Sequence, residues 1–133
     1  MNLLIVQRSR SKRSSLARLY ILNDGTRSFD DADLLSDILI GAAPLADFRV
    51  KVEPALGRVL DLMVGEGLLV WGTVSDRLGV ELTSSGLALA SEIQKDKIMA
   101  LEKERIEFIS PLLTEGRVTE FLKVRPNNAI LDL

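Results

Sequence analysis

The sequence has no cysteine and no histidine among its 133 residues, and only 5% of it is aromatic. Without cysteine the chain has no disulfides, no thiolate nucleophile and no cysteine-ligated zinc or iron–sulfur site. Without histidine it lacks the commonest general base and the commonest metal ligand of proteins. Catalysis would have to rely on carboxylates, lysine, arginine, serine or threonine. We therefore expect a protein that is not an enzyme and that uses no cofactor.

A strong charge of one sign and a long apolar run are also missing. The formal net charge is −2, which argues against a protein dominated by nucleic-acid affinity. No apolar run approaches the roughly 20 residues that a membrane-spanning helix needs. The opening residues, MNLLIVQRSR, place the apolar block before the charges, which is the reverse of a secretory signal. We expect a cytoplasmic protein with no membrane contact and no small-molecule substrate.

Aliphatic residues dominate what is present, since 47% of the chain is hydrophobic, and this length suits one domain with its own core. Met1 to Val6 predicts a short apolar strand or tail. A first helix is expected from Ser14 or Ser15 to Asp24-Gly25. Asp30 or Asp31 is expected to cap a second helix that stops at Gly41.

The second half predicts a hairpin between helices. A short strand is expected around Phe48, Val50 and Val52, and Glu53-Pro54 opens a third helix with an apolar stripe at Leu56, Val59, Leu60 and Met63. LLVWGT and VELT then predict two strands around the polar turn VSDRLG. Thr83, Ser84 or Ser85 caps a helical stretch that is expected to reach about Ile109. The segment TEGRVTEFLK predicts a last short helix.

Three helices, a two-stranded hairpin and another helix follow the order of a winged-helix domain. The predicted fold is thus α+β and mainly helical: a winged-helix domain, three helices plus a β-hairpin wing, with a C-terminal helical extension. We place a basic N-terminal strand or arm at 1–13, the winged helix at 14–95 and the extension at 96–133. An unrelated small α+β domain with a hairpin is the alternative.

The charges of the third helix decide between DNA and protein as its target. The segment of the third helix contains one basic residue, Arg58, against three acidic residues, Glu53, Asp61 and Glu66. This is not the basic stripe of a protein that neutralises several phosphates. The connection before this helix is also long for a DNA-reading helix-turn-helix. We therefore expect a protein-binding module.

The segment from Gln7 to Arg18 is basic and contains no acidic residue. It is interpreted either as a solvated face at a helix start, or as a contact with an acidic partner or with phosphates, including DNA bound without sequence preference, because the guanidinium pairs with both carboxylate and phosphate. The candidate contact residues are Arg8, Arg10, Lys12, Arg13, Arg18, Arg49, Lys51 and Arg58.

The apolar stripe from Leu87 to Ile109 is longer than a helix returning from a wing requires. Part of it either packs within the domain or faces a partner chain, and large apolar side chains are the usual anchors of such interfaces. The candidate interface residues are Trp71, Phe108, Phe121 and Leu122. The acidic residues Asp30, Asp31, Asp33 and Asp37 suit the start of a helix better than a metal site, because their spacing matches no calcium-binding loop.

Three segments together resemble a known family: SSLARLYILNDGTRS, FRVKVEPALGRVLDLMVGEGLLV and VELTSSGLALASEI. They are similar to the middle component of three-component ABC-type systems, which include the Lamassu anti-phage systems. The resemblance implies a small subunit beside an SMC/RecN-like ATPase that bridges this ATPase to an effector, often a nuclease. It implies no catalytic residue. The alternative is a dimeric winged-helix transcription regulator in which the helix from Lys97 to Ile109 dimerises.

Overall fold

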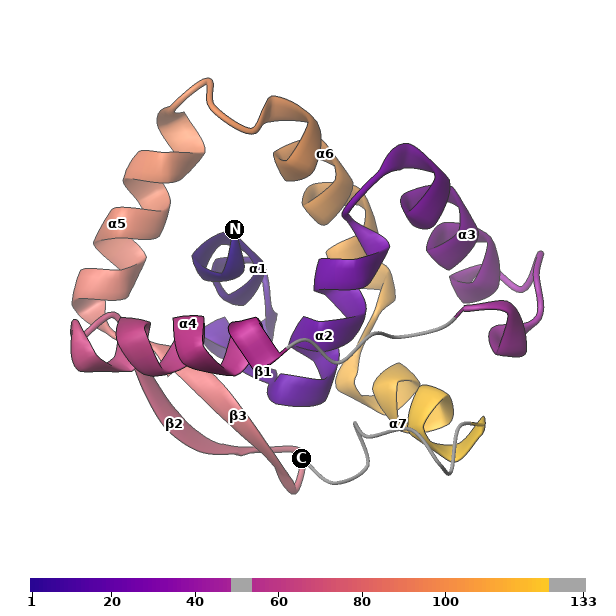
Figure 1. Ribbon diagram of the computed structural model, residues 1–133, viewed down its shortest axis with the longest axis horizontal. Helices are drawn as coiled ribbons and strands as arrows, with labels where there is room; N and C mark the ends of the chain where they lie inside the picture. Colours follow the sequence, from indigo (N-terminus) through magenta and orange to yellow (C-terminus); the bar gives the residue numbers. More distant parts are fainter. Residues whose placement is uncertain (49–53, 125–133) are drawn as a thin grey trace.

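The computed structural model describes residues 1–48 and 54–124, and this part of the chain is α+β and mainly helical. It contains seven α-helices and one three-stranded antiparallel sheet. Figure 1 shows two helices, α1 and α2, in the middle of the fold; α5 and α6 lie beside and above them, and α3 and α7 lie on the other side. The predicted class, a mainly helical α+β protein, is confirmed.

The first element is a helix, α1 (Asn2–Gln7), so the strand or tail predicted for Met1 to Val6 is wrong. Its residues Leu3 to Val6 are all buried, and α1 packs against α2, α5 and β3. A short, continuous apolar run is consistent with either a buried strand or a buried helix. Here α1 is surrounded by α2, α5 and β3, and a helix can bury apolar side chains on all of these sides.

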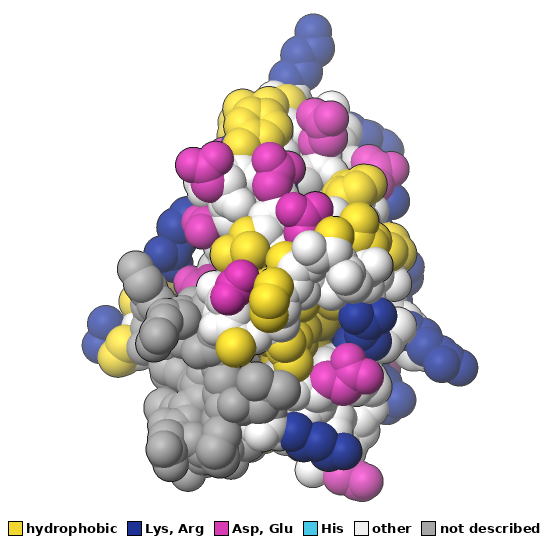
Figure 2. Space-filling model, turned by 90° about the vertical axis from the view of Figure 1, so that its right-hand side faces the viewer, with side chains coloured by type: hydrophobic (Ala, Val, Ile, Leu, Met, Phe, Trp, Pro, Cys, Tyr) yellow, Lys and Arg dark blue, Asp and Glu magenta, His cyan; other side chains and the backbone are white. Residues whose placement is uncertain are grey.

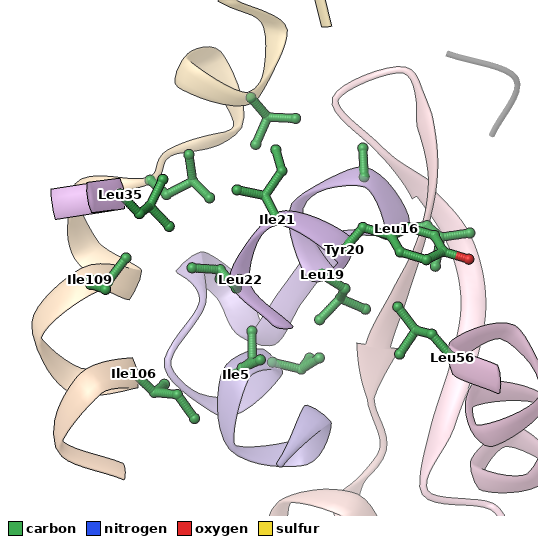
Figure 3. Close-up of a cluster of buried hydrophobic side chains, with 14 of the residues drawn as sticks. Ile5, Leu16, Leu19, Tyr20, Ile21, Leu22, Leu35, Leu56, Ile106 and Ile109 are labelled. Atoms are coloured by element: carbon green, nitrogen blue, oxygen red, sulfur yellow. The ribbon is translucent and has the colours of Figure 1, made fainter. Parts of the chain in front are cut away.

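Helix α2 (Leu16–Gly25) forms the centre of the core; its predicted end at Asp24-Gly25 is confirmed, and it begins one residue after Ser15, the later of the two predicted starts. Ser15 caps it by accepting a hydrogen bond from the Arg18 backbone N–H at 3.2 Å, which satisfies one of the unpaired donors of the first turn. Figure 3 shows its side chains surrounded by Ile5 of α1, Leu35, Leu56, and Ile106 and Ile109. The buried hydrophobic cluster takes residues from all seven helices of the described part of the chain.

Helix α3 (Phe29–Leu39) is capped by Ser28, whose Oγ accepts from the Asp31 N–H at 3.2 Å, so the predicted cap at Asp30 or Asp31 is wrong. Gly41 follows with φ of +84°, the left-handed stop that was predicted. Leu45–Asp47 forms a 3₁₀ turn. The strand predicted around Val50 and Val52 lies outside the described residues.

Helix α4 (Pro54–Gly65) leads into strands β2 (Leu69–Val74) and β3 (Arg77–Leu82), which confirms the predicted third helix and hairpin. The turn is tighter than predicted. Ser75 and Asp76, with φ of 51° and 64°, make a two-residue connection, the type whose twist matches that of the strands. A third strand, β1 (Arg13–Ser15), was not predicted; it pairs with β3 and gives the order β1-β3-β2.

Thr83 caps α5 (Ser84–Lys95) by accepting from the Gly86 N–H at 3.0 Å, as predicted. A methyl group at Gly86 would meet the Leu68 carbonyl oxygen at 2.0 Å, so a residue without Cβ lets this helix lie against the chain entering β2.

The predicted continuous helix to Ile109 is wrong, because α5 and α6 (Ala100–Ile109) are separate. Asp96 accepts from the Ile98 N–H at 3.0 Å and Met99 is left-handed with φ of 57°, so local side-chain bonding and one unusual backbone angle break the run. The last helix, α7 (Glu115–Val124), matches the predicted short helix.

Candidate functional site

Four arginines of the basic segment line a single cleft of about 830 Å³. Arg8, Arg10 and Arg13 have exposed or half-buried side chains, whereas Arg18 is buried. The hairpin turn at Ser75 and the chain between Ser110 and Gly116 also line the cleft. Residues that are far apart in the sequence thus meet in one concave, basic surface.

A strained turn presents the exposed arginines. Arg10–Lys12 forms a 3₁₀ turn in which Ser11 and Lys12 have φ of 58° and 57°. Non-glycine residues avoid this region, and such strain tends to occur at functional sites. Lys12 itself points elsewhere: its Nζ donates to the Gln7 carbonyl oxygen at 2.9 Å, and it does not line the cleft.

Arg18 does not fit the prediction that it contacts phosphate or a partner, because it is only 4% exposed. Its Nε donates to the Leu113 carbonyl oxygen at 2.7 Å, and Nη1 donates to Ser9 Oγ at 2.6 Å. Nη2 donates to the carbonyl oxygen and Oγ of Ser110 at 2.9 and 2.8 Å. Nη1 also reaches Ser14 Oγ at 3.4 Å. The guanidinium therefore holds α2 to the segments around it. The sequence predicted an exposed contact residue because the burial of α2 depends on distant parts of the chain.

Every hydrogen-bond partner of the Arg18 side chain is a neutral oxygen. Burial lowers the pKa of Arg18, and the charge of Glu115 acts in the opposite direction. Glu115 is the one acidic residue on the described cleft wall. Its Oε1 accepts from Arg77 at 2.9 Å and its Oε2 from the Ser15 N–H at 3.0 Å. Glu115 is thus already paired, and the four arginines outnumber this one acid in the cleft lining.

The other predicted basic residues lie elsewhere. Arg58 is exposed on α4, away from the cleft lining, and Arg49 and Lys51 lie outside the described residues. Arg8 makes a loose contact with Glu107, with 3.8 Å between Nη1 and Oε1. The cleft is therefore defined by Arg8, Arg10 and Arg13 around the buried Arg18, and we refer to it below as the arginine cleft.

Helix α4 presents a second candidate surface, which is apolar. Only Leu56 and Leu60 are buried among its residues, whereas Leu62 is 65% and Val59 is 39% exposed. The predicted stripe had placed Val59 in the core. On the adjoining strand β2, Val70 is also exposed. The exposed charges on α4, Arg58 and Asp61, balance each other. We call the exposed side chains of Val59, Leu62 and Val70 the α4 face.

The predicted interface residues divide into three groups. Phe108 is 62% exposed and remains a candidate. Trp71 and Leu122 are partly buried against the core. Phe121 is a correction, because it is buried and its ring packs edge-on against Phe48, with centroids 6.0 Å apart. Its place on the inward side of α7, together with Val118, explains this burial.

The acidic residues near α3 form no metal site. Asp31 and Ser28 bond reciprocally at the start of the helix, and no group of acidic side chains in residues 1–48 and 54–124 is arranged to hold a metal ion. Figure 2 shows the side of the molecule that is on the right in Figure 1, where acidic side chains gather in the upper half with hydrophobic side chains among them. Asp30 and Asp31 lie in the first turn of α3, where a negative charge complements the helix dipole.

Sequence reasoning found the arginines but not the residues that complete the cleft. No local pattern identifies Ser9, Ser110 or the Leu113 carbonyl, because these groups matter only through their hydrogen bonds to Arg18.

No helix in the described part of the chain combines the length and the apolar character that crossing a membrane requires. No family model, curated protein or solved structure matches this chain.

Proposed function

We propose that this protein is a winged-helix adaptor that binds other proteins and carries no catalytic centre of its own. In this proposal α2, α3 and α4 are the three helices of the winged helix, β2 and β3 are the wing, and α5 returns across the core. The element order and the antiparallel hairpin support this assignment.

The observation that carries the proposal is the α4 face. In winged helices that read DNA, a helix enters the groove and basic side chains neutralise phosphates. Here the exposed part of α4 offers Leu62 and Val59 together with one arginine and one acid, Arg58 and Asp61, and Glu66 follows the end of the helix. Exposed apolar side chains on a helix gain free energy when a partner protein covers them.

The proposed partners follow from the resemblance to middle components of three-component ABC-type systems. The resembling segments correspond to α2, to α4 with the start of β2, and to β3 with α5. These elements form the core and the α4 face. We propose that the chain bridges an SMC/RecN-like ATPase to an effector nuclease, with the α4 face as the contact to the ATPase.

The test is affinity purification of the tagged chain from its native host, with partners identified by mass spectrometry. Leu62→Glu places a charge at the most exposed of the three side chains of the α4 face. Ile40→Glu is the matched control, because Ile40 is 65% exposed, the same as Leu62, and lies on the far side of the fold near α3. The wild-type chain and Ile40→Glu are expected to retain a large coiled-coil ATPase and a nuclease-like chain.

With Leu62→Glu, the amount of ATPase that co-purifies is expected to fall at least about tenfold, since a buried, unpaired charge in an interface costs several kcal/mol. Recovery of the wild-type chain without a coiled-coil ATPase would overturn the adaptor proposal. Equal loss with both variants would show that the α4 face is not the contact.

A dimeric winged-helix transcription regulator is the second candidate, and α6 is the observation in its favour. Leu101 and Phe108 of α6 are 50% and 62% exposed, although Ile106 and Ile109 of the same helix lie in the core. This candidate requires a homodimer that Phe108→Glu converts to a monomer, measured by light scattering, and salt-sensitive binding to a palindromic DNA site.

A further inference from the structure

The arginine cleft brings four arginines together, and Glu115 is the one acidic residue among its described lining residues. Arg10 and Arg13 have exposed side chains with no ion-pair partner within the described part of the chain. Arg18 adds a buried charge whose bonds all end on neutral oxygens. Such a concave surface concentrates anions, because its low-dielectric walls focus the field.

We propose that the arginine cleft binds a phosphate group, carried either by a free nucleotide or by the terminal phosphate of a nucleic-acid strand. The inference goes beyond the adaptor proposal and does not depend on it. The cleft is built from the N-terminal segment, the hairpin turn and the start of α7, and none of these belongs to the α4 face.

The side chains of the cleft suit a phosphate group. Guanidinium groups pair with phosphate oxygens in a bidentate manner, and Arg8, Arg10 and Arg13 supply three of them to the cleft lining. Exposed hydroxyls at Ser11 and Ser75 supply further donors. The volume of about 830 Å³ falls within the range of small-ligand sites, roughly 300–1,000 Å³.

Arg18 acts as a positioning residue in this proposal. Its donors already hold the Ser9 hydroxyl and the chain from Ser110 to Leu113, so it contributes charge and shape without touching the ligand. The first turn of α7 also opens on the cleft at Glu115 and Gly116, where the helix dipole favours an anion. Glu115 does not oppose this, because Arg77 and the Ser15 N–H hold its carboxylate.

The test uses the full chain and fluorescence anisotropy of a labelled single-stranded oligonucleotide with a 5′-phosphate, against the same strand with a 5′-hydroxyl. ATP and inorganic tripolyphosphate serve as competitors. The variant is Arg10→Ala combined with Arg13→Ala, and Arg10→Ala alone is the second variant in case the double one does not fold. Lys12→Ala is the matched control: it removes a charge from the same turn, but from a side chain that does not line the cleft.

We expect a phosphate-bearing probe or competitor to bind, and the double variant to weaken that binding by at least about tenfold, because two charge-assisted hydrogen-bonding groups are lost. Lys12→Ala should change it by less than about twofold. Competition by ATP identifies a free nucleotide as the source. Preference for the 5′-phosphorylated strand without competition by ATP identifies a strand end.

Three outcomes would overturn the inference. The first is that neither strand, ATP nor tripolyphosphate binds. The second is that Lys12→Ala weakens binding as much as the double variant, which would indicate general charge attraction. The third is that a glutamate-rich peptide competes as well as tripolyphosphate, which would make the cleft a contact for an acidic protein. Leu62→Glu should leave phosphate binding unchanged, so failure here and failure of the adaptor proposal are distinguishable.

Discussion

Helices α2 and α4 have similar lengths, 10 and 12 residues, but opposite environments. Nine residues of α2 are buried, whereas only Leu56 and Leu60 of α4 are. Both helices are rich in aliphatic side chains, so their composition alone does not separate them. The difference shows that α2 is the structural axis of the fold, while α4 keeps apolar side chains on its surface, where a partner can cover them.

The two arginines of these helices extend the comparison. Arg18 of α2 is buried and must satisfy its donors internally, because an unpaired buried charge is costly. Arg58 of α4 lies in water, which solvates it without help from the protein. Arg18 therefore stabilises the fold only through its hydrogen bonds to neighbouring segments, whereas Arg58 is accessible to a partner.

The sharpest way to break the comparison is to truncate one leucine in each helix. Leu19→Ala in α2 removes a side chain that is 0% exposed and should lower the free energy of unfolding by about 3–4 kcal/mol, through lost burial and a cavity. Leu62→Ala in α4 should change it by less than about 0.5 kcal/mol. Urea denaturation followed by circular dichroism measures both. Similar losses at the two sites would mean that α4 is packed in solution.

The arginines give the next largest effect. Arg18→Met should cost about 2–3 kcal/mol, because the carbonyl oxygens of Leu113 and Ser110 lose their side-chain donor inside the protein. Arg58→Met should stay within about 0.5 kcal/mol. The same denaturation experiment applies. A stable Arg18→Met variant would show that water or another donor replaces the guanidinium.

The smallest expected effects on stability come from one glycine in each helix, and they have opposite signs. At Gly25, the last residue of α2, a methyl group would meet Leu35 Cδ2 at 2.2 Å, whereas nothing lies within 4 Å of one at Gly57 in α4. Gly25→Ala should therefore destabilise the protein by about 1–2 kcal/mol. Gly57→Ala should stabilise it by about 0.5–1 kcal/mol, because alanine is the better helix former. Differential scanning calorimetry should show melting temperatures that move in opposite directions.

Local signals predicted part of this structure well. Thr83 was one of three candidate caps, Pro54 was named as a helix start and Gly41 as a stop, and each of these three residues has that role in the structure. These features depend on a few neighbouring backbone groups. The hairpin was found for the same reason, although its turn proved shorter.

Features that depend on distant contacts were predicted poorly. The run from Leu3 to Val6 forms a helix because α2, α5 and β3 surround it, which no local pattern reveals. The basic segment was recognised as a unit, but the fold divides it: Arg18 is buried, Lys12 turns away, and the remaining arginines line the cleft. Burial of Phe121 against Phe48 likewise depends on how α7 docks.

The sequence by itself determined the composition limits, most helix ends and the hairpin, because caps, turns and short-range periodicity are local physics. Only the tertiary structure decided which apolar side chains stay exposed on α4 and which arginines share a cleft. Those outcomes depend on packing between elements up to about 100 residues apart, as in the bond from Ser15 to Glu115. Burial and charge pairing are properties of that packing, and the order of residues along the chain does not encode them locally.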